Sequence, residues 1–192
     1  MSSSIETGVT GADAVGSTEG LRNLYYARFG FAVVWAVLML GAAATTLTPL
    51  GIALLVLYPL FDVAAAVIDF RTSGAARPKA PLYLNMALSL LTAVGLAAAV
   101  TSGIPDVLRV WGAWAITAGI VQSIVAIARY RLGGQWAMIL SGGISALAGA
   151  SFVAGAGAPN ASLTPLAGYA TLGGIFFLIS AIRLHRRGAR AR

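Results

Sequence analysis

Residues 29–61 read FGFAVVWAVLMLGAAATTLTPLGIALLVLYPLF, a run of 33 residues without a charged side chain. A helix needs about 20 apolar residues to cross about 30 Å of hydrocarbon, so this run is too long for a single crossing. The segment TTLTP at 45–49 interrupts it, and proline is favoured at the first position of a helix, where its missing N–H costs nothing. The run therefore predicts two membrane helices, over about 24–45 and 49–70, joined by a turn.

The rest of the chain repeats this pattern. Small and polar residues at 101–106 and 155–164 split two further apolar regions, which predicts helices over about 82–101, 106–128, 136–154 and 163–184. The whole chain is 58% hydrophobic and only 10% charged, whereas a soluble domain has about 25% charged residues. We therefore expect an all-α, polytopic membrane protein with six transmembrane helices.

The positions of lysine and arginine predict the orientation, because cytoplasmic loops carry the excess of these residues. Six helices place twelve of the thirteen basic residues on one side and Arg109 alone on the other. The twelve are Arg22, Arg28, Arg71, Arg77, Lys79, Arg129, Arg131, Arg183, Arg186, Arg187, Arg190 and Arg192. We therefore expect both termini in the cytoplasm of a bacterial cell, with the chain in its inner membrane.

The two ends of the chain are expected to lie outside the membrane domain, which spans about 22–187. Residues 1–21 are rich in Ser, Thr, Gly and Ala, have too little apolar surface to offset the entropy of ordering, and lack the pattern of a signal peptide. This predicts a disordered cytoplasmic tail. The basic tail at 188–192 and the arginines near it are expected to contact anionic lipid headgroups. These arginines are Arg186, Arg187, Arg190 and Arg192.

Three series of residues recur in phase with the helices and indicate an internal repeat. A proline opens the second helix of each pair, an arginine closes it, and a glycine recurs every 54 residues in the first helix. The series are Pro49, Pro105 and Pro165; Arg71, Arg131 and Arg186; and Gly41, Gly95 and Gly149. The sequence thus predicts three repeated helical hairpins, for which a pseudo-threefold arrangement is natural.

The second and third hairpins carry the most specific pattern. They contain WGAWAITAGIVQSIVAIAR at 111–129, WAMILSGGISALAG at 136–149 and LGGIFFLISAIR at 172–183. Over about 24–187 the chain resembles the HdeD family of small bacterial inner-membrane proteins, whose repeats carry Trp, spaced glycines and a closing Arg. The first hairpin departs from the pattern, because Pro59 stands where the later copies have Gly119 and Gly174. The resemblance implies a non-enzymatic role in acid or envelope stress, without a substrate or a catalytic mechanism.

Asp62 is the main candidate for a site within the membrane, where ionisable residues are costly and default to functional candidates. Pro59 is expected to kink the helix one turn earlier, and Tyr58 is placed to donate a hydrogen bond to Asp62. Under the repeat alignment Asp62 corresponds to Gln122 and to Phe177. Two of the three copies would thus place a polar group at one depth, on a shared axis.

Two interpretations of Asp62 remain open at this stage. Hydrocarbon disfavours a charged carboxylate, so Asp62 is either a site that takes up a proton or a cation, or a structural carboxyl that pairs with a neighbouring Tyr or Gln. The first interpretation favours a small transporter or channel for protons or a small solute, as the alternative to a stress protein. Water around Asp62 would favour transport, and a dry core would favour a structural or stress role.

Several function classes have no support in the sequence. The chain has no cysteine and a single histidine, and it has no phosphate-binding glycine loop, HExxH motif or second carboxylate to act with Asp62. We expect no enzymatic activity, no metal and no cofactor. Its basic residues form short clusters between apolar runs, which is unlike a nucleic-acid-binding face. The expected partner is the lipid bilayer; a homo-oligomer is compatible with the sequence, which identifies no protein partner.

Overall fold

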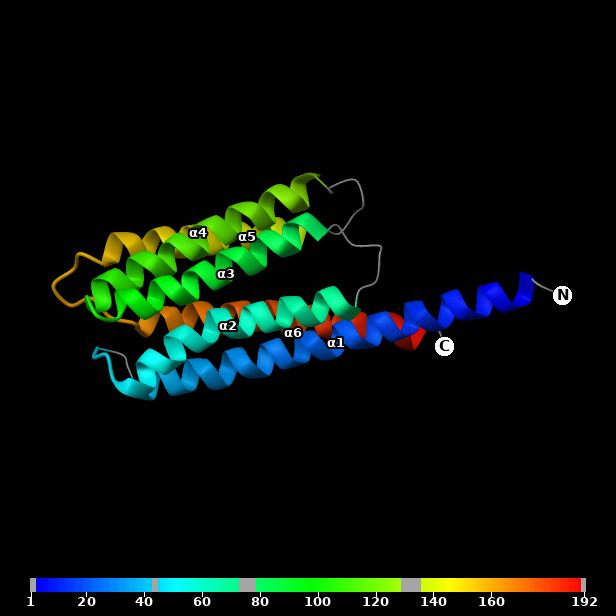
Figure 1. The fold of residues 1–192 in the computed structure, drawn as a ribbon, viewed down its shortest axis with the longest axis horizontal. Helices are drawn as coiled ribbons and strands as arrows, with labels where there is room; N and C mark the ends of the chain where they lie inside the picture. Colours follow the sequence, from blue (N-terminus) through cyan, green and yellow to red (C-terminus); the bar gives the residue numbers. More distant parts are fainter. Residues whose placement is uncertain (1–2, 43–44, 73–78, 129–135, 191–192) are drawn as a thin grey trace.

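The computed structural model describes the chain over residues 3–42, 45–72, 79–128 and 136–190, with side chains described within 19–42, 45–71, 80–127 and 136–186. Within these ranges the regular elements are all helices, joined by short turns and loops (Figure 1). The helices are α1 (Ser3–Ala42), α2 (Pro49–Thr72), α3 (Lys79–Ala99), α4 (Ile104–Ala128), α5 (Trp136–Gly155) and α6 (Thr164–Arg190).

Each of these six described helices contains a segment long and apolar enough to cross a membrane. The predicted fold class, an all-α integral membrane protein with six transmembrane helices, is thereby confirmed. The predicted boundaries lie within about three residues of the observed ones, except at the two ends of the chain. There α1 and α6 continue beyond their membrane-spanning segments, which are Glu19–Ala42 and Thr164–Arg186. Side chains at 3–18 and 187–192 lie outside the described part, and disorder over 1–21 stays a prediction.

The bundle has two distinct ends, visible in Figure 1. At one, here called the terminal end, lie the N-terminus of α1, the C-terminus of α6, and the ends of α2, α3, α4 and α5 that face them. At the other, the hairpin end, short connections join α1 to α2, α3 to α4, and α5 to α6. Proline opens or nearly opens α2, α4 and α6 at the hairpin end, as predicted. There Arg109 pairs with Asp106, one turn earlier in α4.

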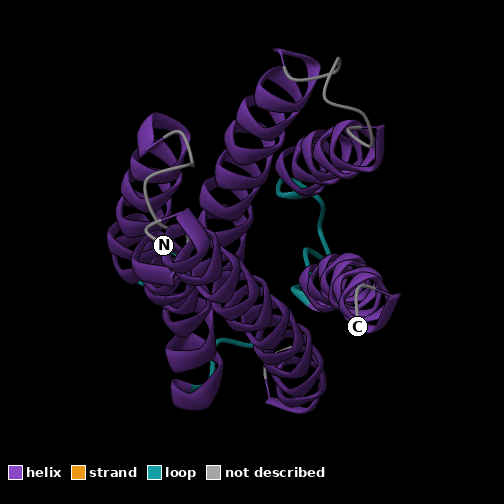
Figure 2. Cartoon of the chain, turned by 90° about the vertical axis from the view of Figure 1, so that its right-hand side faces the viewer, coloured by secondary structure: helices purple, strands orange, loops and turns teal. Residues whose placement is uncertain are grey.

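The helices form a ring in chain order, seen nearly end-on in Figure 2. The most extensive packing joins α4 to α5, α1 to α6, and α2 to α3, whereas α5 and α6 pack least against each other. The closest neighbours therefore belong to successive predicted hairpins rather than to the same one. The repeat stays a prediction, and its glycines differ in environment: Gly41 has open space beside it, while Gly149 packs against α4.

Glycines explain the close approach of α4 and α5. Gly112 of α4 faces Gly149 of α5, and Gly119 of α4 faces Gly142 of α5. The two glycines on each helix are seven residues apart. A Cβ on Gly112 would lie 2.6 Å from the carbonyl oxygen of Gly149, which is closer than atoms normally approach. Small residues let helix backbones come together in lipid, where the hydrophobic effect contributes little to association. The contact requires glycine on both helices.

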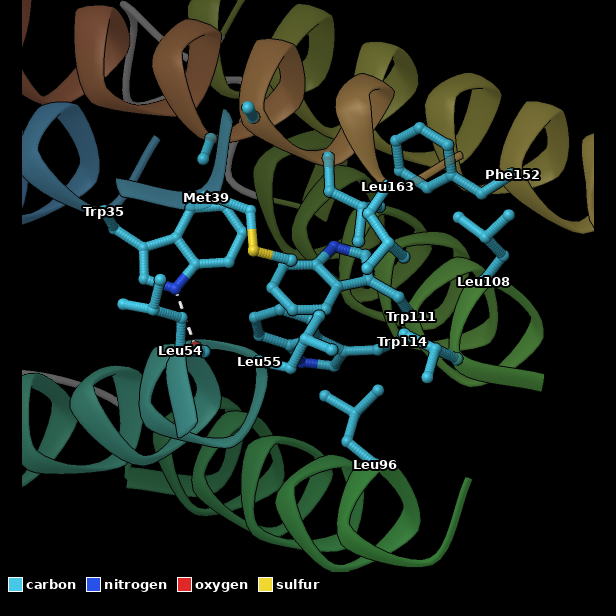
Figure 3. Close-up of a cluster of buried hydrophobic side chains, with 14 of the residues drawn as sticks. Trp35, Met39, Leu54, Leu55, Leu96, Leu108, Trp111, Trp114, Phe152 and Leu163 are labelled. Carbon is cyan, nitrogen blue, oxygen red and sulfur yellow. Dashed lines mark hydrogen bonds between the residues drawn. The ribbon is translucent and has the colours of Figure 1, made fainter. Parts of the chain in front are cut away.

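The half of the bundle nearest the hairpin end has a dry core of large side chains, here called the aromatic–aliphatic layer (Figure 3). Its large, fully buried members come from α1, α2, α3, α4, α6 and the residue just before α6, Leu163, and Phe152 of α5 packs at its edge. These members are Trp35, Met39, Leu55, Leu96, Val107, Trp111, Leu163 and Leu166. The rings of Trp35 and Trp111 are stacked with centroids 5.4 Å apart, and Trp35 Nε1 donates to the carbonyl of Leu54 at 2.7 Å.

Candidate functional site

The half of the bundle nearest the terminal end contains a cavity of about 460 Å³. This lies within the range of small-molecule sites, about 300–1,000 Å³. Its lining extends from the middle of the bundle, at Tyr58, Trp114 and Ser145, to the terminal end, at Asp69 and Ala137. None of the fully buried residues of the aromatic–aliphatic layer lines it. The cavity therefore reaches the terminal end and is closed toward the hairpin end.

Asp62 of α2 is the polar centre of the cavity, and three side chains contact its carboxylate. One oxygen accepts from Arg28 of α1, in an ion pair. The other accepts from Asn85 Nδ2 at 2.9 Å and from Ser89 Oγ at 2.7 Å, both on α3. A buried carboxylate is tolerated when it is paired and its remaining lone pairs accept hydrogen bonds. These contacts tie α1, α2 and α3 together.

Arg28 and Asp62 lie at the same depth in the membrane-spanning region. Arg28 is nine residues from the start of the α1 span at Glu19, and Asp62 is nine residues from the end of the α2 span at Arg71. At 1.5 Å per residue, each lies about 13 Å from that end of its membrane-spanning segment. Their side chains keep 17% and 20% of their surface exposed. Because both line the cavity, this exposed surface faces its interior.

Arg28 was missed as a site residue by the sequence reasoning, which assigned it to the basic cluster that sets the orientation. The structure corrects this assignment, since Arg28 lies inside the bundle and its guanidinium also covers the ring of Phe177 at 4.8 Å. The available signal was its position four residues inside the first predicted helix. An arginine within a span is itself a candidate, and the natural partner for it there was the single carboxylate predicted at mid-membrane depth, Asp62.

The other predicted site residues, Tyr58 and Gln122, line the same cavity as Asp62. Neither forms a hydrogen bond with Asp62 among the described residues, and Gln122 Nε2 donates instead to the carbonyl of Met138 at 3.0 Å. The carboxylate is engaged by Arg28, Asn85 and Ser89 rather than by a tyrosine or glutamine. The hydrogen bond from Asn85 to Asp62 joins α3 to α2. Pro59 is buried inside α2, and the kink expected there stays a prediction.

The second helices of the three predicted hairpins present equivalent positions to the cavity. Asp62, Gln122 and Phe177, which the repeat alignment places at one depth, all line it. So do their equivalents one turn closer to the hairpin end, which are Tyr58, Ala118 and Gly173. In the next turn Leu55, Ala115 and Ala170 have no exposed surface, while Trp114 and Tyr169, beside the last two, still line the inner end of the cavity. The change from cavity to dry core thus begins at a similar level in α2, α4 and α6.

Two buried indole N–H groups have no hydrogen-bond partner among the described residues, those of Trp111 and Trp114. An unpaired polar group in an apolar interior costs about 1–3 kcal/mol, so such groups call for an explanation. Trp111 belongs to the dry layer. Trp114 is 8% exposed and lines the cavity, but its indole nitrogen has no accessible surface and so does not open onto the cavity.

The wall between α5 and α6 is the weakest part of the cavity. Both helices contribute lining residues, yet they pack against each other less than any other neighbours in the ring. One polar contact joins them at the inner end, where Ser145 Oγ and Tyr169 Oη lie 2.7 Å apart. Ser145 Oγ also lies 3.2 Å from the carbonyl oxygen of Ala115 in α4. Toward the terminal end, Met138 and Leu172 line the cavity and remain 43% and 38% exposed.

The remaining predicted contacts concern the surface and metal binding. Arg186 is exposed near the end of α6, as a headgroup contact requires, while the side chains of Arg187, Arg190 and Arg192 lie outside the described residues. Among the described residues there is no group of three His, Cys, Asp or Glu side chains that could hold a metal ion.

Comparisons with known proteins add nothing to this description. A scan against protein-family models, a search of curated proteins and a search of solved structures found no match to this chain. The resemblance to the HdeD family therefore stays a prediction from the residues that carry it.

Proposed function

We propose that this integral membrane protein is a non-enzymatic carrier that binds a small solute in the cavity around Arg28 and Asp62. The observation that carries the proposal is a membrane-buried ion pair exposed to a cavity large enough for a small molecule. A pair that served only to hold helices together would be better enclosed, because water and open space weaken it. Its exposure to the cavity makes it available to a ligand.

The closed inner end of the cavity favours a carrier over a channel. A channel needs a continuous polar path, whereas the aromatic–aliphatic layer interrupts any such path between the cavity and the hairpin end. A carrier exposes its site to one side at a time. A cavity that reaches one end and is closed at the other fits one state of such a cycle, with the solute site near mid-membrane depth.

The proposed orientation places the cavity mouth in the cytoplasm of a bacterial cell, with the protein in the inner membrane. Twelve of the thirteen basic residues belong to the terminal end by chain position, and cytoplasmic segments carry such an excess. Tags added at the two termini test this orientation by their accessibility in intact cells and in inverted vesicles. Labelling of either terminus in intact cells would contradict it.

Solute exchange in reconstituted vesicles tests the carrier. The protein is reconstituted into vesicles, given a pH step or a solute gradient, and compared with empty vesicles for proton flux and for exchange of a panel of small polar and amphipathic solutes. We expect saturable exchange of a solute that the double variant Arg28→Gln/Asp62→Asn loses. The variant Arg109→Gln, which alters a surface ion pair at the hairpin end, serves as the control and should keep it. Flux equal to that of empty vesicles across the panel would reject the carrier.

A second candidate is the non-transporting role in acid or envelope stress that the resemblance to the HdeD family implies. The observation that favours it is the same dry layer, which closes the bundle and is expected in a protein that conducts nothing. Acid survival of cells with the parent or the Asp62→Asn variant tests this candidate. Reduced survival together with absent flux in vesicles would support it over the carrier. Equal survival would remove the link between the site and acid resistance.

A further inference from the structure

The hydrogen-bonding capacity left unused around the ion pair defines the kind of ligand that fits the cavity. A guanidinium has five N–H donors, and among the described residues only one of those on Arg28 is used, toward Asp62. The carboxylate, by contrast, already accepts from three donors. A ligand therefore meets a nearly saturated acceptor beside a largely unsaturated donor.

The Tyr58 hydroxyl is a further group without a partner at the inner end of the cavity. It has no hydrogen bond among the described contacts, and Tyr58 lines the cavity with Arg28. The donors left unused on these two residues call for a ligand with acceptor oxygens. A cationic ligand would have to displace Arg28 from Asp62 and would leave these donors unpaired.

The charge of the cavity and the side chains that line it restrict the class of ligand further. Arg28 is the one basic residue among the described residues that line the cavity, so the site offers a single positive charge to a ligand. Aromatic rings line much of the remaining wall, from Tyr25, Tyr169 and Phe176. Flat rings recognise aromatic or apolar groups by stacking and edge contacts. The combination fits one negative charge on an apolar body.

We propose that the cavity binds an apolar or aromatic monocarboxylate, with its carboxylate on the guanidinium of Arg28 and its body among the aromatic side chains. This inference rests on the proposed binding site and names its ligand class. Arg28 then exchanges between two carboxylates: Asp62 holds it when the cavity contains no ligand, and the ligand shares or takes it on binding. Bidentate arginine–carboxylate pairing supplies the geometry for this exchange.

Binding of a matched series of compounds to the purified full-length protein in detergent tests the charge requirement. The series is 3-phenylpropanoate, the neutral 3-phenylpropanamide and the cationic 3-phenylpropylamine, measured by isothermal titration calorimetry and by the shift in melting temperature. We expect the carboxylate to bind at least about tenfold more tightly than either analogue, since a charge-assisted hydrogen bond is roughly twice as strong as a neutral one. Equal binding of the amide, tighter binding of the amine, or no binding of the carboxylate would overturn the proposal.

Substitutions of Arg28 and of Asp62 should change the affinity for the carboxylate in opposite directions, which a purely structural role of the ion pair would not produce. Arg28→Gln should weaken carboxylate binding by at least the same factor of about ten. Asp62→Asn should tighten it, because the variant removes the competitor for Arg28 and leaves a cation that the ligand can neutralise. The carboxylate should therefore raise the melting temperature of Asp62→Asn more than that of the parent. Weaker binding to folded Asp62→Asn than to the parent would overturn the proposal even if Arg28→Gln fails to fold.

Controls separate this inference from the proposed carrier function. Arg109→Gln removes an arginine outside the cavity and should bind the carboxylate as the parent does. Binding of the carboxylate without solute exchange in vesicles would refute the carrier function but would not affect the proposed ligand class. Exchange of a neutral or cationic solute by a protein that ignores the carboxylate would refute the ligand class and leave the carrier.

Discussion

The substitution Gly149→Ala tests whether the contact between α4 and α5 holds the wall of the cavity in place. A Cβ at Gly149 would lie 2.5 Å from the carbonyl oxygen of Gly112 and 2.8 Å from the amide nitrogen of Ile116. The shorter distance is about 0.9 Å below the 3.4 Å at which ordinary contact begins. Both of these atoms belong to the backbone of α4, so a side-chain rotation cannot relieve the clash. The two helices would have to move apart by about that amount.

The expected cost follows from comparison with a glycine that has no such neighbour. Gly143 is on the same helix, and a Cβ added there would have nothing within 4 Å, so Gly143→Ala should stabilise α5 by about 0.5–1 kcal/mol through lower backbone entropy of the unfolded chain. Gly149→Ala gains the same term but incurs an overpacking cost of about 1–3 kcal/mol, or more where backbone must shift. At roughly 2–4 °C per kcal/mol for a chain of this size, the two variants should differ by about 2–12 °C in melting temperature.

Thermal unfolding of the two variants and the parent in one detergent measures this difference. Tryptophan fluorescence is a suitable signal, because Trp111 and Trp114 lie on α4 within the bundle. Gly149→Ala should melt below the parent, and Gly143→Ala at or above it. Equal melting temperatures for Gly149→Ala and Gly143→Ala would refute the close approach of α4 and α5, and with it the position of the α5 wall of the cavity.

Three other predictions concern the cavity and its boundary. Tyr169→Phe removes the hydrogen bond to Ser145 between α5 and α6 and should lower stability by about 1 kcal/mol; a melting temperature equal to that of the parent would contradict a role for this contact in holding the two helices together. Because the chain has no cysteine, Ser141→Cys in the cavity should react with a water-soluble maleimide much faster than Ala170→Cys in the dry half; equal rates would contradict the division into two halves. Pro59→Ala restores an N–H donor within α2 and should slow solute exchange in vesicles without changing equilibrium binding; unchanged or faster exchange would contradict movement of α2 at that point.

The number of helices and their limits could be predicted because they depend on local properties of the sequence. The length of each apolar run fixes how many times it can cross the hydrocarbon, and Pro49 and the TTLT segment before it mark a turn without reference to any other helix. Bilayer thickness supplies the one outside constraint. Packing between helices has no such simple rule. The glycines of the predicted repeat show this, since Gly41 and Gly149 occupy equivalent positions in sequence but face open space and a helix backbone, respectively.

The site could be predicted only in part. A carboxylate within an apolar segment is recognisable from the sequence alone, but the sequence does not identify the residues that contact it. Asp62 stood out by its depth alone, and the repeat placed Gln122 at the same level. The residues that contact Asp62 come from α1 and α3, whose rotation about their own axes decides which side chains face inward. Arg28 lies close enough to the start of its helix to resemble a loop residue that sets orientation. Arg28 could therefore be a residue that sets the orientation or a residue of the site. Only the packing of α1 against α6, which turns the Arg28 face of α1 toward the bundle, distinguishes these two interpretations.

The boundary between the cavity and the dry half links the sequence repeat to the proposed function. In α2, α4 and α6 the change from lining residue to fully buried residue falls within one helical turn at equivalent positions, and α2 differs from the others by carrying Pro59 there. A proline leaves the carbonyl one turn earlier, that of Leu55, without its helical donor, and Leu55 belongs to the dry layer. The neighbouring carbonyl, of Leu54, accepts from Trp35 Nε1 of α1. The first hairpin thus departs from the other two at the level where a carrier must open the dry layer to expose its site to the other side. The ion pair between Asp62 and Arg28 lies about one helical turn from Pro59. A ligand that draws Arg28 away from Asp62 therefore acts directly on α1 and α2, the two helices that meet at this weakened point.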